Sequence, residues 1–298
     1  MNRFAQARIA FDYTVEQMAD SLSVSIDEVN RWEADSNLIE RTTLQNMALL
    51  FNTSIDDLRG TNPFETQIST NSFFVDNSEI NAFWGHVGIE FQDEKEAVWY
   101  PISQRVEKGL KAAIKIATRS HSWVAFQTLN NGFILLNLVN IQSVMFSNKR
   151  HPEMKINLPD TWDIQGYPLD IYRALSALYT KPYAYQWDSN YSDGFIEAVK
   201  RILNQENIHP SHFEGLCNTR IDYINSKVCD GYRITAEALY TLYQTIESGA
   251  VPFMYNLYDQ DKGVDQFVLL NQIAMIQGPL FEVVDYINST EELSESPK

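Results

Sequence analysis

Four side chains in the sequence are candidates for binding a metal ion: His209, His212, Cys217 and Cys229. Their spacing matches no common zinc pattern, because structural zinc sites usually take two close ligands from each of two segments. Two cysteines in 298 residues also form no disulfide framework, which is typical of a reducing compartment. We therefore expect buried free thiols and surface histidines, with no bound metal and no cofactor.

Nucleophilic catalysis would need a recognisable arrangement of residues that this sequence does not contain. It has no Gly-flanked serine elbow, no phosphate-binding loop and no His-Glu zinc helix. His121 lies in an apparent strand, where a histidine is usually a surface residue or a satisfied one. We expect no enzymatic activity.

Aromatic residues are concentrated at residues 181–195, KPYAYQWDSNYSDGF, and could line a ligand pocket or stack nucleic-acid bases. Base stacking normally accompanies a basic groove, whereas Asp188 and Asp193 interrupt this segment. We expect packing within a loop, and a small-molecule or protein-binding site is the alternative.

The whole chain is acidic, with 23 basic and 39 acidic residues and a net charge of -16. Such a protein is repelled by nucleic acid and by anionic membranes, so any DNA contact requires a local basic patch. No apolar run reaches the roughly 18 residues of a membrane span, and the N-terminus lacks the order of a secretory signal. We expect a cytoplasmic protein without membrane contact, built from two or three folding units.

Residues 3–59 predict five short helices, because helix start signals recur there. Each signal is a Ser or Thr N-cap with an acid or amide three residues later. The four pairs are Thr14 with Gln17, Ser25 with Glu28, Thr42 with Gln45, and Ser54 with Asp57. Apolar residues fall on one face of each helix, namely Met18, Ala19 and Leu22; Val29 and Trp32; Leu44, Met47, Ala48 and Phe51; and Ile55 and Leu58. These faces predict one small core.

The run TVEQMADSLSVSIDEVNRWEADSNLIERTTLQNMALLFNTSIDDL resembles the lambda repressor-like (Cro or XRE-type) helix-turn-helix family. The positions that carry the resemblance are Met18, Ala19, Val24, Val29, Trp32 and Glu33, together with LLFNTSIDDL at the end. It covers about 60 residues, a fifth of the chain. The resemblance implies that residues 1–60 form a DNA-binding domain.

In this family the third helix lies in the major groove, and its early residues reach the base edges. By position, the implied readers are Ile26, Asp27, Glu28, Asn30 and Arg31. Asp and Glu can accept only from cytosine amino groups, whereas arginine and amides do most base reading. The Gln that the family often places at the start of the second helix is Val15 here, and its Gly after the third helix is Asp35. These departures leave the fold expected and make the recognition doubtful.

The first 60 residues contain five arginines, no lysine and ten acids, a local balance of -5. Phosphate attraction supplies most non-specific affinity, so Arg8, Arg31 and Arg41 would have to cluster on the DNA side. Asp27 and Glu28 have a second interpretation as first-turn acids, which stabilise a helix by about 0.3 to 1 kcal/mol each. A protein-interaction module that keeps the helix-turn-helix shape without using DNA is therefore the alternative to a regulator.

Beyond residue 60 we predict a multidomain α+β protein. Residues 61–78 are rich in Asn, Thr and Ser and predict a linker. Residues 79–150 predict a helix and a hairpin turning at NNG, and residues 231–288 predict a second copy. The copies share Phe133 with Phe267, LLN at 135–137 with LLN at 269–271, and IQ at 141 and 276. We interpret them as a duplicated helix plus small antiparallel barrel that distantly resembles the Sm-like or SH3-like arrangement. Residues 151–230 predict helices, and residues 289–298 a disordered acidic tail.

Taken together, the sequence predicts a DNA-binding transcriptional regulator with a C-terminal oligomerisation or sensing region. One small helical domain recognises only a few base pairs, so family members generally present two copies. We expect a homo-oligomer, a dimer in the first instance, assembled through apolar β segments after residue 60. An unidentified protein or small molecule could act as its effector.

Overall fold

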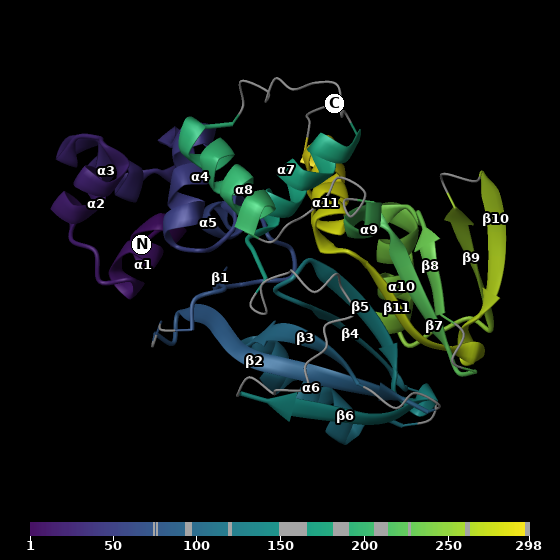
Figure 1. The fold of residues 1–298 in the computed structure, drawn as a ribbon. Coiled ribbons are helices and arrows are strands. Elements are labelled where there is room, and N and C mark those ends of the chain that lie inside the picture. The colour runs from purple at the N-terminus through teal and green to yellow at the C-terminus, as the bar shows by residue number, and fades with distance from the viewer. Residues whose placement is uncertain are drawn as a thin grey trace.

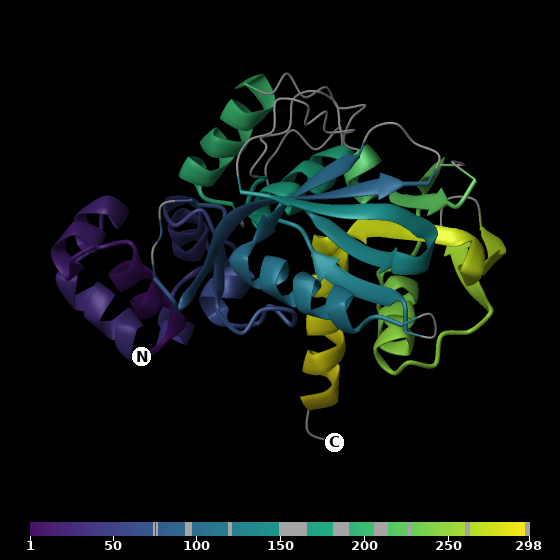
Figure 2. The same ribbon diagram turned by 90° about the horizontal axis from the view of Figure 1, so that it is seen from below.

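The computed structural model describes residues 1–73, 75, 77–92, 97–118, 121–148, 166–180, 191–205, 214–225, 228–259 and 263–295. The N-terminal helices form a lobe at one end of the molecule, and the sheets with their covering helices form the larger body (Figure 1, Figure 2). Over the described residues, no helix combines the length and the apolar character needed to cross a bilayer.

The N-terminal lobe contains the five predicted helices. They are α1 (Arg3–Ala10), α2 (Val15–Leu22), α3 (Ile26–Ala34), α4 (Arg41–Leu50) and α5 (Ile55–Arg59), with the 3-10 turn η1 (Ser36–Leu38) after α3. Three predicted N-caps are confirmed, because the side chains of Thr14, Ser25 and Ser54 each accept a hydrogen bond from the backbone N–H three residues later. Local capping therefore sets three of the five helix starts.

The fourth predicted N-cap, Thr42, is wrong. α4 begins one residue earlier, at Arg41, and Glu40 precedes it without a side-chain capping bond. Gln45 is buried, and its side-chain oxygen accepts a hydrogen bond from the backbone N–H of Ser192 at 2.9 Å. The amide that suggested a capping box is therefore used to hold the lobe against the body.

The predicted apolar faces do close one core in the lobe. Its buried members include Met18, Ala19, Val29, Trp32, Leu44, Met47, Ala48, Phe51, Ile55 and Leu58. Helix α1 adds Phe4, whose ring meets that of Trp32 edge-on at 6.3 Å. Leu22 is only half-buried, at the end of its helix.

Residues 61–78, predicted as a linker, are largely packed in the described part of the segment. They contain the short strand β1 (Ile68–Thr70), and Asn62, Glu65 and Asn71 are buried. The hydroxyl of Thr70 donates to the carbonyl oxygen of Phe51 at 2.7 Å. Polar composition predicted exposure, but these groups are satisfied by hydrogen bonds inside the protein.

The body contains the remaining strands and helices. The strands are β2 (Ile80–Phe91), β3 (Val98–Ser103), β4 (Trp123–Gln127), β5 (Gly132–Asn137), β6 (Ile141–Ser147), β7 (Thr219–Tyr223), β8 (Val228–Tyr232), β9 (Met254–Asp259), β10 (Val264–Leu269) and β11 (Ile273–Pro279). The helices are α6 (Gln104–Ile116), α7 (Leu169–Thr180), α8 (Asp193–Gln205), α9 (Glu214–Cys217), α10 (Ala236–Glu247) and α11 (Leu280–Glu295), with 3-10 turns η2 (Leu138–Asn140) and η4 (Leu270–Gln272).

The strands form open sheets, and the predicted small barrels are not closed. One sheet has the order β1-β2-β3 with β6 also paired to β2, a second has the order β4-β5-β11-β7-β8, and β9 pairs with β10 alone. Every pairing is antiparallel except that of β1 with β2. The strand that covers the edge of β5 is β11, from the distant end of the chain, rather than β6.

The order of elements occurs twice in the body. The first repeat, residues 80–147, runs β2, β3, α6, β4, β5, η2, β6, and the second repeat, residues 219–279, runs β7, β8, α10, β9, β10, η4, β11. In each repeat the last strand returns antiparallel to the first, β6 on β2 and β11 on β7. The duplication thus includes a leading hairpin that the sequence pattern did not predict.

A constant spacing of 132 residues relates the two repeats. Gly132 and Val264 begin equivalent strands, Leu138 and Leu270 begin the 3-10 turns, and Ile141 and Ile273 begin the last strands. The helix caps Ser103 and Thr235 obey the same spacing, and each accepts from the N–H three residues later. Each last strand also carries an irregularity after its first residue, where Gln142 and Ala274 are skipped in the pairing.

The sequence alignment of LLN at 135–137 with LLN at 269–271 is therefore two residues out of register. Leu135 is equivalent to Phe267 in the structure, not to Leu269. The error has a simple cause, because shifting a strand by two residues leaves every side chain on the same face and preserves the apolar pattern.

Strand β5 separates two apolar cores in the body and is buried along its whole length. Ile134 and Leu136 face the core formed with β2, β3 and α6. Phe133 and Leu135 face the core formed with α7, α10 and α11. The two repeats therefore share this strand as a common wall.

Two further predictions differ from the structure. The region 151–230, predicted helical, contains α7, α8 and α9 but also β7 and the start of β8, so the second repeat begins before residue 231. Residues 289–295, predicted disordered, belong to α11, whose earlier residues Val283, Val284 and Ile287 are buried against the body. Packing of that first half supports the polar second half, which composition alone does not predict.

Replacing Leu136 with alanine should destabilise the protein by about 2 to 5 kcal/mol, because the side chain is fully buried and the shared wall cannot collapse around the cavity. The free energy of unfolding from urea titration measures the effect. Val139→Ala, at an exposed site three residues away, is the control and should cost much less. A Leu136→Ala variant as stable as the parent would contradict the assignment of β5 as a shared wall.

Candidate nucleic-acid interface and its support

Helices α2 and α3 are joined by a tight turn that fixes their angle. Ser23 adopts a left-handed conformation with φ 56°, and the N–H of Val24 donates to the carbonyl of Ala19 at 2.9 Å. Both helices start with a reciprocal capping box, at Thr14 and at Ser25. This geometry is that of a helix-turn-helix pair.

The outer face of α3 carries the side chains that the sequence singled out. Ile26 is 45% exposed, and Asp27, Asn30 and Arg31 are also exposed. Helix α3 lies at the outer end of the lobe, on the side away from the body (Figure 1). The described part of the body therefore leaves this face accessible.

Glu28 is engaged in capping its own helix. Its carboxylate accepts hydrogen bonds from both the N–H and the hydroxyl of Ser25, each at 2.9 Å. The backbone hydrogen bond from Ser25 is the main cause that lowers the pKa of Glu28, followed by the Ser25 hydroxyl. Of the five implied base readers, Glu28 thus has a structural role in the free protein.

Arg8 lies inside the lobe rather than on its outer face. Its side chain is 13% exposed; Nε is 2.5 Å from Glu33 Oε1, and Nη1 donates to the carbonyl of Tyr13 at 2.6 Å. The guanidinium therefore ties α1 to α3. It is not presented to a phosphate, in contrast to the sequence expectation.

Arg31 and Arg41 remain exposed but do not form a basic patch. Arg31 is 66% exposed and lies 3.9 Å from Glu28, one turn earlier on α3. Arg41 lines a cavity of about 600 Å³ between the lobe and the body, whose lining also includes acidic residues. Those acids are Asp56, Asp170, Asp285 and Glu291. The three arginines expected on the DNA side are thus dispersed.

A buried guanidinium joins the lobe to the body. Arg173 of α7 lies 2.6 Å from Asp56 of α5, 3.1 Å from Asp170 of its own helix and 2.7 Å from Asp285 of α11. Although burial disfavours the charged form, the carboxylates of Asp170, Asp56 and Asp285 raise the pKa of Arg173 above its ordinary value. Arg173 therefore remains a cation that holds three helices together.

Asp170 also caps the last helix of the lobe from outside. Its Oδ2 accepts a hydrogen bond from the backbone N–H of Ile55, at 2.8 Å, in the first turn of α5. A carboxylate at a helix N-terminus satisfies a backbone donor that the helix itself leaves unpaired. Together with the contact of Ser192 to Gln45, these bonds fix the orientation of the lobe.

A second buried acid lies beside this junction. Asp57 accepts from the hydroxyl of Ser54 at 2.7 Å and from the amide of Asn62 at 3.1 Å. Burial raises the pKa of Asp57 to about 7, although the hydrogen bond from Ser54 opposes that change. The nearby carboxylates of Glu65 and Asp56 raise it further. Asp57 is therefore largely protonated in mildly acidic solution.

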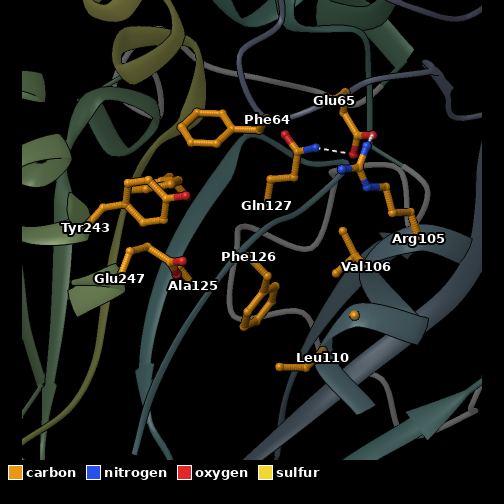
Figure 3. Close-up of a pocket in the computed structure, with 12 residues that line it drawn as sticks. Phe64, Glu65, Arg105, Val106, Leu110, Ala125, Phe126, Gln127, Tyr243 and Glu247 are labelled. Carbon is orange, nitrogen blue, oxygen red and sulfur yellow. Dashed lines mark hydrogen bonds and ion pairs between the residues drawn. The ribbon is translucent and has the colours of Figure 1, made fainter. Parts of the chain in front are cut away.

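Figure 3 shows a smaller cavity of about 220 Å³ between the two repeats. Val106 and Leu110 of α6 line one side, and Tyr243 and Glu247 of α10, the equivalent helix of the second repeat, line another. The remaining lining residues are Phe64, Glu65, Arg105, Gly109, Ala125, Phe126, Gln127 and Phe133.

The polar group at the rim of this cavity is already satisfied internally. Glu65 accepts from Asn81 at 3.0 Å and from Gln127, and Arg105 lies 3.2 Å from its other oxygen. Burial raises the pKa of Glu65, whereas Arg105 is the main opposing cause. The open part of the cavity is mostly aromatic, so it suits a compact, partly apolar molecule smaller than most ligands.

The other candidate chemistry of the sequence gains little support. No group of three or more His, Cys, Asp or Glu side chains suited to a metal occurs in the described residues, and His209 and His212 lie outside them. Cys217 is a buried free thiol 3.0 Å from Ser176, and burial raises its pKa. Most of the aromatic segment 181–195 also lies outside the described residues.

Sequence reasoning missed the Arg173 cluster because its partners are far apart in the chain. Only Asp170, three residues from Arg173, was visible as a local helix pair. Asp56 and Asp285 meet the same guanidinium through tertiary packing.

Comparison with known families agrees with the geometry of the lobe. Residues 4–58 match the family model described as helix-turn-helix. No curated protein and no solved structure gave a significant match to the chain. The N-terminal lobe is thus a helix-turn-helix domain of the lambda repressor-like type, and the body has no counterpart among the proteins compared.

Replacing Arg173 with alanine should destabilise the protein by about 3 to 5 kcal/mol, because it leaves buried carboxylates without their counter-charge. Urea unfolding monitored by tryptophan fluorescence measures this loss. Arg201→Ala, which removes an exposed arginine from α8, is the control and should be nearly neutral. Equal stability of the two variants would show that Arg173 does not hold the junction.

Stability should fall as the pH rises from about 4 to about 7, in part because of Asp57. The folded-state pKa lies above the unfolded value of 3.8, so the folded protein binds this proton more tightly. The contribution is complete below the unfolded pKa and is lost as the pH rises through the folded pKa. Asp57→Asn should flatten the dependence of the urea midpoint over this range, whereas Asp20→Asn, at an exposed site, should leave it unchanged. A steep dependence that persists in Asp57→Asn would argue against a protonated Asp57.

Proposed function

We propose that the protein is a DNA-binding transcriptional regulator in which α3 enters the major groove and the body brings several copies together. The observation that carries this proposal is the position of α3, on the outer end of a helix-turn-helix domain, with its side chains directed away from the body. In this family the same helix reads base edges.

Rigid attachment of the lobe supports a regulatory role. The contacts of Arg173, Asp170 and Gln45 fix the lobe against α7, α11 and the start of α8. In an assembly, the body then determines the distance between the α3 helices of neighbouring copies. Such a regulator would discriminate half-sites by their spacing, because a rigid pair fits only one separation along the duplex.

Electrostatics imply that a single copy binds weakly. The lobe has a balance of -5, and Arg8 is withdrawn into an internal ion pair. Few phosphate contacts also mean a shallow salt dependence for each copy. Useful affinity would then come from linking several lobes in one assembly.

A second candidate function is protein recognition through the same face, without DNA. It is favoured by the exposed apolar side chains of Ile26 and Leu38, which lie near the exposed acid Asp27. An apolar and acidic surface suits a basic protein partner better than a phosphate backbone.

Selection of bound sequences from random duplex DNA, using the full chain at low salt, tests the proposal. Enrichment of a motif with two spaced half-sites is the expected result. A full chain that retains no duplex above background, while remaining folded by circular dichroism, would reject DNA binding and favour the second candidate.

Two substitutions on α3 should change binding to the selected DNA in opposite directions. Arg31→Ala should weaken binding and relax sequence preference, because arginine is the strongest base reader on this face. Asp27→Lys should strengthen non-specific binding by replacing a repulsion with a phosphate contact. Fluorescence anisotropy with labelled duplex measures both.

Matched controls lie on α8, which is remote from α3 in the lobe. Arg201→Ala and Glu197→Lys make the same charge changes at exposed positions there. If the α3 variants and the α8 controls shift affinity equally, overall charge rather than α3 governs the interaction.

A further inference from the structure

The β9–β10 hairpin and the residue before it expose more apolar surface than a soluble edge normally does. Phe253 and Phe267 are 66% and 64% exposed. The exposed apolar side chains of this segment are Phe253, Met254, Tyr258, Val264, Phe267 and Leu269. The hairpin forms a separate two-stranded sheet at the end of the molecule opposite α3 (Figure 1).

The equivalent hairpin of the first repeat is covered. Strand β5, the counterpart of β10, pairs with β4 on one edge and with β11 on the other. All six residues of β5 are buried as a result, whereas only one residue of β10 is buried. The difference is therefore that β10 lacks the strand that β11 provides to β5.

The strand that corresponds to β11 is β6, and it also has a vacant side. β11 pairs with β7 on one edge and with β5 on the other. β6 pairs with β2 alone; within the described ranges, no other strand pairs with it. Each chain thus presents both halves of a junction that it already uses once internally.

We propose that β10 of one copy pairs antiparallel with β6 of a second copy, repeating the β5–β11 junction between chains. Applying the spacing of 132 residues to the internal pairing gives the register. It places Ser143 opposite Val268, Val144 opposite Phe267, Met145 opposite Gln266, and Phe146 opposite Asp265.

Side-chain chemistry in this register is complementary. Opposite residues of an antiparallel pair lie on the same face of the sheet, so the exposed ring of Phe267 would pack beside Val144. On the same face, the ammonium of Lys111 lies 4.9 Å from the ring centre of Phe146. Asp265 of the second copy would therefore approach Lys111 as a counter-charge.

A second copy fits these edges better than an unrelated strand does, because the two edges already match each other inside the chain. The contact is heterologous, with different surfaces on the two copies, so association proceeds head to tail until it closes. The inference deepens the homo-oligomer of the proposed function. It is tested without DNA, so its failure leaves DNA binding by the lobe a separate question.

Light scattering on the full chain at micromolar concentration gives the first test, with a mass above that of one chain as the expected result. Phe267→Lys and Val264→Lys, which place a charge on the exposed strand, should return the mass to that of one chain. Ile116→Lys, at an apolar site 80% exposed on α6, is the matched control and should associate like the parent. Far-ultraviolet circular dichroism should be unchanged in all three, since the sites are exposed.

Cross-linking tests the register. Met145→Cys and Gln266→Cys, made in separate chains and mixed, should be joined by a short bismaleimide into a covalent dimer. A mixture of Met145→Cys with Ile116→Cys, and the parent with its own Cys217 and Cys229, are the controls and should yield much less.

Three results would overturn the proposal. A parent that has the mass of one chain at these concentrations shows that the edges do not pair. Association that survives Phe267→Lys and Val264→Lys places the interface elsewhere. Equal cross-linking of the matched and control mixtures shows that β6 and β10 are not opposed.

Discussion

Pairing between β5 and β11 is the interaction on which the body depends. A strand that is buried on both faces must have its backbone groups paired on both edges, because unpaired N–H and C=O groups are costly away from water. β4 supplies one edge of β5, and β11, about 130 residues later in the chain, supplies the other. Both body cores include residues of β5, so the second repeat completes the first.

The lobe is held to this body by charge rather than by apolar contact alone. Arg173 contacts carboxylates on α5, α7 and α11, and Asp170 caps α5 across the junction. Buried ion pairs contribute little net stability compared with apolar packing, but they are directional and costly to break. This arrangement suits a joint whose task is orientation. It turns a compact helical domain into a fixed part of a larger molecule.

The two ends of the molecule have different characters. α3 lies at one end with a face that is polar, acidic and mostly unengaged, and the β9–β10 hairpin lies at the other with apolar side chains exposed. Because the lobe is rigidly joined to the body, contacts made at the hairpin end would set the positions of several α3 helices. A domain with few positive charges benefits from such coupling more than a basic domain does.

The sequence alone determined the local features of this protein. The capping boxes at Thr14 and Ser25 and the apolar faces of the first five helices are encoded within a few residues, so the helix-turn-helix domain could be predicted. The repeat was visible in outline, but its register was not, because an apolar strand pattern is unchanged by a shift of two residues. Only the tertiary structure decided that β5 pairs with β11, that Arg8 turns inward to Glu33, and that Arg173 gathers Asp56 and Asp285. These contacts join residues far apart in the chain, and no local pattern specifies which distant partner a strand edge or a charge will meet.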